Sequence, residues 1–141
     1  MKDLKSLIRL HKFRLDEKRR SLKDLESLRV HFDTALARLE AEVRTEKRTV
    51  ETAPEMAFAF ADYAASARER RLKLIDSIDE SERQIEQARE AVNEAFQELK
   101  KYQITQANRE RMAAQHAARL EQAKLDEIGL IAYRRRGRAA G

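Results

Sequence analysis

Few residues of this 141-residue chain could carry out acid–base chemistry or bind a metal, and those few are scattered. The three histidines, His11, His31 and His116, lie too far apart in sequence for a local metal site, and none has other ligands at a suitable spacing. The absence of Cys excludes disulfides, thiolate metal sites and cysteine nucleophiles. We therefore predict that the protein has no metal and no cofactor.

Asp79–Glu80 and Asp126–Glu127 are pairs of adjacent carboxylates and therefore candidates for acid–base catalysis. Catalytic carboxylates need an enclosed pocket that shifts their pKa, and solvated acids on a helix surface have none. No Ser–His–acid grouping is present, and the first Gly is residue 129, which excludes a Gly-rich phosphate loop before that point. The sequence predicts a protein that is not an enzyme and has no catalytic residues.

The hydrophobic pattern predicts the elements that carry these side chains. Positions spaced alternately four and three apart, starting at Leu4, are apolar at ten of fourteen sites. This 3.5-residue repeat, unbroken by Gly or Pro, is typical of a coiled-coil helix and predicts a first helix over about residues 3–52. The stripe consists of Leu4, Ile8, His11, Leu15, Lys18, Leu22, Leu25, Arg29, Phe32, Leu36, Leu39, Val43, Glu46 and Val50.

The single proline, Pro54, marks the one predicted interruption, because Pro disfavours helix at the preceding residue and suits a first helical turn. We place a hinge at about residues 52–55. From Phe60 to Leu130 the same spacing is apolar at fifteen of twenty-one positions, with more Ala than in the first stripe. This pattern predicts a second helix over about residues 55–133, with Gly129 and Gly137 as candidate stopping points and a basic tail over 134–141.

Two such helices must bury their stripes against each other, because neither is stable alone. A short reversal makes them antiparallel, so the predicted fold class is all-α, a long antiparallel two-helix coiled-coil hairpin forming one domain over residues 1–141. A tight turn would put residue n near residue 107 − n, which brings Leu4 to Tyr102 and Gln106. Roughly 25–30 residues of the second helix would then overhang with an exposed apolar stripe.

Charge is concentrated at both ends of the chain. Residues 1–23 contain nine Lys and Arg against three Asp and Glu, a net of +6, and residues 134–141 add +4, while the middle is −5. In a hairpin we expect the two basic blocks to share one end, which would suit an acidic surface or cavity of a partner. Self-association of the overhang into a homodimeric coiled-coil scaffold is the alternative.

A nucleic-acid or anionic-membrane binder is a further alternative, because Arg134-Arg135-Arg136-Gly137-Arg138 resembles a basic patch. The patch has no interleaved aromatics apart from Tyr133, so we favour a protein partner over nucleic acid. The longest apolar run, Met56 to Ala61, has six residues, far fewer than the roughly 20 that cross a bilayer. The N-terminus lacks the apolar segment of a secretory signal, so we expect a chain that stays in the cytoplasm.

Three aromatic residues, Phe58, Phe60 and Tyr63, follow the hinge closely. Spaced two and three apart, they cannot all face one antiparallel neighbour. They either form a hydrophobic plug at the tip of the hairpin or a docking surface for another protein.

The chain resembles the FliJ family of the bacterial flagellar export apparatus. The resemblance rests on the length, the single hinge, the basic first helix beginning Leu4-Lys5-Ser6-Leu7-Ile8-Arg9, and the ending Arg119-Leu120-Glu121-Gln122-Ala123-Lys124-Leu125-Asp126-Glu127-Ile128 before a run of Arg. It implies a coiled coil similar to the stalk subunit of rotary ATPases, whose helix ends bind the hexameric flagellar export ATPase. It also implies a tip that contacts the export-gate protein FlhA, and a link to export chaperones, in the cytoplasm at the inner face of the cell membrane.

On this resemblance we expect two partner-binding sets of residues. The set for the ATPase end is Leu4, Ile8, Lys12, Leu120, Asp126 and Arg134. The set for the export gate at the hairpin tip is Phe58, Phe60 and Tyr63.

Overall fold

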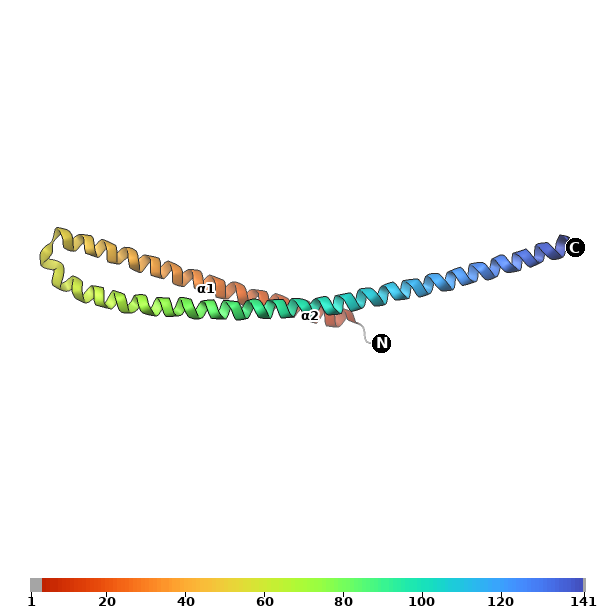
Figure 1. The fold of residues 1–141 in the computed structure, drawn as a ribbon, viewed down its shortest axis with the longest axis horizontal. Coiled ribbons are helices and arrows are strands. Elements are labelled where there is room, and N and C mark those ends of the chain that lie inside the picture. Colours follow the sequence, from red (N-terminus) through yellow and green to blue (C-terminus); the bar gives the residue numbers. More distant parts are fainter. Residues whose placement is uncertain (1–3, 141) are drawn as a thin grey trace.

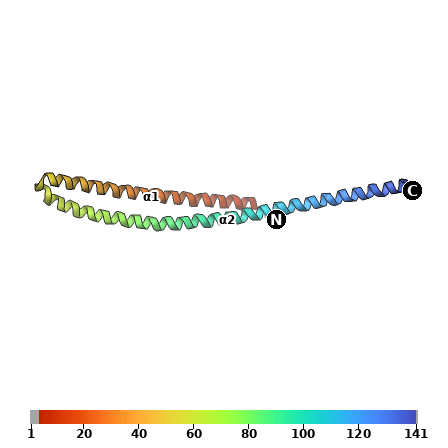
Figure 2. The same cartoon turned by 45° about the horizontal axis from the view of Figure 1, so that its top comes forward.

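The structure, a computed structural model that describes residues 4–140, consists of two long helices joined by one short turn. Helix α1 is Leu4–Thr52, the 3-10 turn η1 is Pro54–Met56, and helix α2 is Ala57–Ala140. Figures 1 and 2 show α1 lying antiparallel along the first part of α2, with the C-terminal part of α2 extending alone beyond it. The predicted all-α hairpin is confirmed, and the described residues contain no strand.

The reversal is made by the backbone around Ala53 and Pro54. Ala53 is extended, with φ −137° and ψ 81°, as steric contact with the following proline ring favours. Its N–H still donates to the carbonyl of Thr49 at 3.0 Å, which closes α1, and the N–H of Met56 donates to the carbonyl of Ala53 at 2.9 Å. Pro54 therefore occupies the first position of η1, where its missing N–H costs nothing.

The two predicted stripes form the contact between the helices. In α1 every stripe position except Lys18 and Glu46 is at least partly buried, and Leu15 is only 3% exposed. In α2 the stripe is at least partly buried from Phe60 to Gln106, with the sole exception of Arg71. The smallest exposures in α2 include those of Ala67, Ser81 and Ile85, so part of this seam is made by small side chains that allow close approach.

The pairing of the two helices differs from the tight-turn expectation by about one helical turn. Arg29 forms an ion pair with Glu82 at 2.8 Å, whereas a tight turn predicted residue 78 at that level. Arg71 pairs in the same register with Glu40 at 3.4 Å. The shift arises because Ala53 and η1 lengthen the connection. Leu4 therefore lies level with about residue 107, just beyond the predicted neighbours Tyr102 and Gln106.

The C-terminal end also differs from the expectation, because α2 continues to Ala140 through the segment predicted as a basic tail. Gly129 and Gly137 do not end the helix, and neither has a positive φ. We call residues 107–140 the overhang, since burial ends at Gln106. At 1.5 Å per residue it is about 50 Å long.

Candidate protein-binding surfaces

The overhang presents its whole circumference to solvent, and each side chain from residue 107 to 139 is exposed. Large apolar side chains occur along its full length, with exposures between 43% and 75%. These are Met112, Leu120, Leu125, Ile128, Leu130, Ile131 and Tyr133. Isolated apolar residues are normal on a protein surface, but seven on one unpartnered helix indicate a binding segment.

The two basic blocks do not meet, contrary to the sequence expectation. In the observed register the described part of the N-terminal block, residues 4–23, lies beside the part of α2 that ends near residue 107. Arg134 follows 27 residues later, which is about 40 Å along a straight helix. The separation follows from the length of the overhang: Figure 1 shows the start of α1 near the middle of the rod and the C-terminal end of α2 at its far end.

The residues predicted for the ATPase end divide between these two places. Leu4 is buried and Ile8 is half-buried in the seam, while Lys12 is exposed on α1. The other three, Leu120, Asp126 and Arg134, are exposed on the overhang. There Asp126 accepts a hydrogen bond from Gln122 Nε2 at 3.0 Å. The six residues thus do not form one continuous surface in this structure.

The aromatic residues near the hairpin tip point in different directions. Phe58 is 90% exposed, with Met56 about half exposed nearby in sequence. Phe60 is half-buried at the seam, and its ring lies 6.3 Å from that of Tyr63. Phe58 is therefore available to another protein, whereas Phe60 and Tyr63 also fill space between the helices.

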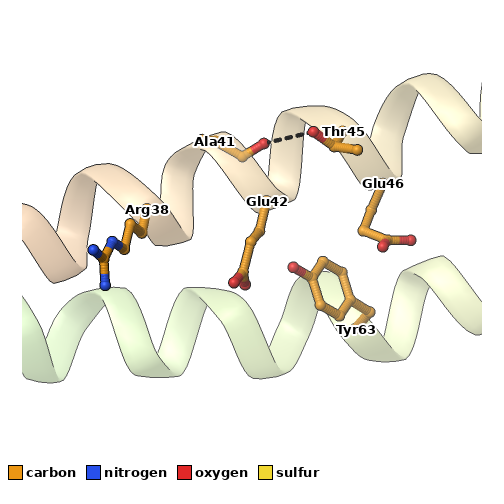
Figure 3. A pocket seen from close by; sticks show the side chains of 6 residues that line it. All are labelled: Arg38, Ala41, Glu42, Thr45, Glu46 and Tyr63. Atoms are coloured by element: carbon orange, nitrogen blue, oxygen red, sulfur yellow. Dashed lines mark hydrogen bonds between the residues drawn. The ribbon is translucent and has the colours of Figure 1, made fainter.

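A shallow pocket of about 450 Å³ lies on the flank of the hairpin that carries Tyr63. Its lining includes Arg38, Glu42 and Glu46 on α1, and Figure 3 shows the ring of Tyr63, from α2, between the carboxylates of Glu42 and Glu46. The hydroxyl of Thr45 donates to the carbonyl of Ala41 at 3.1 Å, within α1 itself. We call this side, defined by Glu42, Glu46 and Tyr63, the acidic flank.

A groove of about 460 Å³, which was not predicted from the sequence, lies on the other flank of the hairpin. Its apolar floor is formed by Leu39, Val43, Phe60, Ala64 and Ala67. Its rim consists of Arg44, Lys47, Arg68, Arg71 and one acid, Glu40. We call it the cation-rimmed groove. The sequence does contain basic residues beside both apolar stripes. Assigning those of the two helices to one groove requires the correct register.

The described residues provide little for catalysis or metal binding. They contain no group of three or more His, Asp or Glu side chains that could hold a metal ion. One electrostatic effect is local: a hydrogen bond from Arg83 and the charge of Arg83 lower the pKa of Glu80, which is an exposed residue. Within the described residues, neither helix has a stretch long and apolar enough to span a bilayer.

Comparison with known proteins adds independent information. A family model described as "Flagellar FliJ protein" matches residues 1–138. Two relatives named Flagellar FliJ protein, from two strains of Caulobacter vibrioides, are each 26% identical over 125 residues, which make up 89% of this chain and 90% of the relative. No solved structure matches significantly.

Proposed function

The chain belongs to the FliJ family and is a component of the flagellar protein export apparatus, within which we propose that it acts as a non-enzymatic stalk. In this proposal the overhang binds the hexameric export ATPase, and the hairpin tip contacts the export-gate protein FlhA. The same rod escorts export chaperones. The protein works in the cytoplasm and reaches the inner face of the membrane through these partners.

The observation that carries the proposal is the overhang, a single helix about 50 Å long that is exposed on all sides. Its apolar residues could be buried only by a surface that surrounds or grips the helix, such as the central opening of a ring. The paired part of the hairpin would remain outside and keep the tip free for a second protein. One rod could therefore contact two components at once.

Charge indicates that the overhang binds a different protein and not a second copy of this chain. Parallel pairing of two overhangs would place the two Arg134–Arg138 segments side by side. Antiparallel pairing would place each such segment near Arg109 and Arg111 of the other copy. Both arrangements bring like charges together, which costs free energy, whereas an acidic or polar partner surface would not.

The experiment is a titration of the full-length protein against the purified export ATPase, with ATP hydrolysis and binding as readouts. We expect binding and a changed hydrolysis rate. Leu120→Asp combined with Ile131→Asp should abolish both effects, because it places charge among the exposed apolar side chains of the overhang. Absence of binding at low salt by the unchanged protein would refute the stalk function.

A further inference from the structure

The cation-rimmed groove has an apolar floor because small side chains of α2 face larger ones of α1. Ala64 and Ala67 lie in the α2 seam, and their methyl groups cannot fill the space beside Leu39 and Val43. Phe60 closes the end of the floor nearest the turn. The groove is open to solvent along one side, so another side chain or helix can reach this floor without moving α1 or α2.

Three of the four rim cations have no acidic partner. Arg71 is paired with Glu40 at 3.4 Å, which uses the only acid of the rim. Among the described residues, Arg44, Lys47 and Arg68 take part in no ion pair. The apolar floor is therefore lined by three cations that no carboxylate of the described residues neutralises through an ion pair.

The tip of the hairpin carries almost no net charge. This distinguishes two kinds of anionic partner, a membrane surface and a narrow acidic ligand. Residues 44–71 contain six Lys and Arg and five Asp and Glu. A membrane surface attracts a protein through charge summed over a wide area, so a net charge of +1 provides little attraction. A narrow acidic ligand would meet only the rim of the groove, where the positive charge is concentrated.

We propose that the cation-rimmed groove docks an acidic amphipathic helix of a partner protein. Apolar residues of that helix cover Leu39, Val43 and Phe60, and carboxylates along its edges pair with Arg44, Lys47 and Arg68. The α1 part of the groove spans residues 39–47, about 12 Å, so two to three turns of helix suffice. The inference goes beyond the stalk function, since it specifies the chemistry of the ligand whichever protein supplies it.

The test uses the full-length protein and designed peptides as probes. Each peptide has about 14 residues, a Leu stripe that contains one Trp, and flanking charges that are all Glu or all Lys. Since the protein contains no Trp, the emission of the peptide reports its transfer into an apolar environment without background. We expect the Glu peptide to bind with a blue shift, and the Lys peptide to bind at least about tenfold more weakly.

Charge-reversed variants locate the site. Lys47→Glu combined with Arg68→Glu should weaken binding of the Glu peptide about tenfold and strengthen binding of the Lys peptide. The matched control, Arg38→Glu with Arg48→Glu, changes the net charge equally at exposed residues that do not line the groove. It should leave both affinities within about twofold. All four positions are exposed, so circular dichroism should show unchanged helix content.

Three outcomes would overturn the inference. One is failure of the Glu peptide to bind, and another is equal weakening by the groove variant and its control. The third is binding of the protein to phosphatidylglycerol vesicles that is lost in the groove variant while the Glu peptide shows no binding, which would assign the cations to a membrane. None of these readouts involves the export ATPase, so the stalk function and this inference can fail separately.

Discussion

The imidazole ring of His11 stacks on the phenol ring of Tyr102, with 4.7 Å between the ring centroids and 22° between the planes. Both residues occupy stripe positions and both are half-buried. The stacked pair lies close to the end of the paired part of the rod, where burial stops at Gln106. It therefore joins the N-terminal part of α1 to α2 close to the point where the overhang begins.

Replacing either ring should loosen this end of the hairpin. We expect Tyr102→Ala to lower the free energy of unfolding by about 1–2 kcal/mol, because a half-buried aromatic ring is lost from the seam. A double-mutant cycle with His11→Ala should give a coupling of about 0.5–1.5 kcal/mol. Urea unfolding monitored by circular dichroism measures the free energy of unfolding of the original protein, the two single variants and the double variant. Strict additivity of the two substitutions would show that the rings do not interact in solution.

The ion pair between Arg29 and Glu82 tests the register. Arg29→Glu should destabilise the protein by about 0.5–1 kcal/mol, and adding Glu82→Arg should recover most of that loss, because the pair is restored in reverse. Both side chains are partly exposed, so the effect should shrink in high salt. Lack of recovery in the double variant would contradict the observed register and favour the tighter turn.

Much of the fold could be predicted from the sequence, because a 3.5-residue repeat fixes which side of each helix is buried. His11 and Phe32 illustrate this, as both lie in the seam where the spacing placed them. The register could not be predicted, since it depends on how many residues the turn at Pro54 consumes. The predicted end of the second helix, at about residue 133, was wrong because Gly129 and Gly137 were taken as candidate stopping points, although a solvated helix tolerates Gly at a cost of about 1 kcal/mol.

The candidate surfaces were harder to predict than the fold. Leu120 and Arg134 are exposed, as expected from the predicted extension of the second helix beyond the first. The groove lined by Val43 and Arg68 was missed, because its two walls come from different helices and one turn of misregister puts the wrong residues opposite each other. The roles of the predicted partner-binding residues in contacting the export ATPase and FlhA stay predictions.

Substitution of apolar residues should destabilise the protein strongly in the seam and hardly at all in the overhang. Leu15→Ala should lower the free energy of unfolding by about 2–3 kcal/mol, because Leu15 is buried between the helices. Leu120→Asp should change it by less than about 0.5 kcal/mol, because Leu120 is 53% exposed on an unpaired helix. Thermal and urea unfolding of the two variants provide the comparison. A large loss for Leu120→Asp would mean that the overhang is covered by a second copy of the chain.

The pH dependence of Glu80 should be small and of a defined sign. Its pKa lies below the ordinary 4.5 because Arg83 donates a hydrogen bond to the carboxylate and adds a favourable charge. A lowered pKa in the folded state adds stability above the unfolded-state pKa, and that stability is lost as the pH falls through the folded-state pKa. NMR titration of the Glu80 carboxyl carbon should show this low pKa, and Arg83→Gln should raise it toward 4.5. An unchanged titration curve in that variant would remove Arg83 as the cause.

The basic C-terminal segment should act on the rate of partner binding more than on the final complex. Arg134, Arg135, Arg136 and Arg138 are exposed at the far end of the overhang, about 40 Å beyond the paired helices. Charges at a free end enter the field of an acidic partner first, so they accelerate encounter at low salt. Replacing all four by Gln should therefore slow association with the export ATPase about tenfold at low ionic strength and leave dissociation nearly unchanged. Stopped-flow measurements across a salt series would separate the two rates. A variant that associates at the original rate but dissociates faster would show that these arginines form close contacts within the complex.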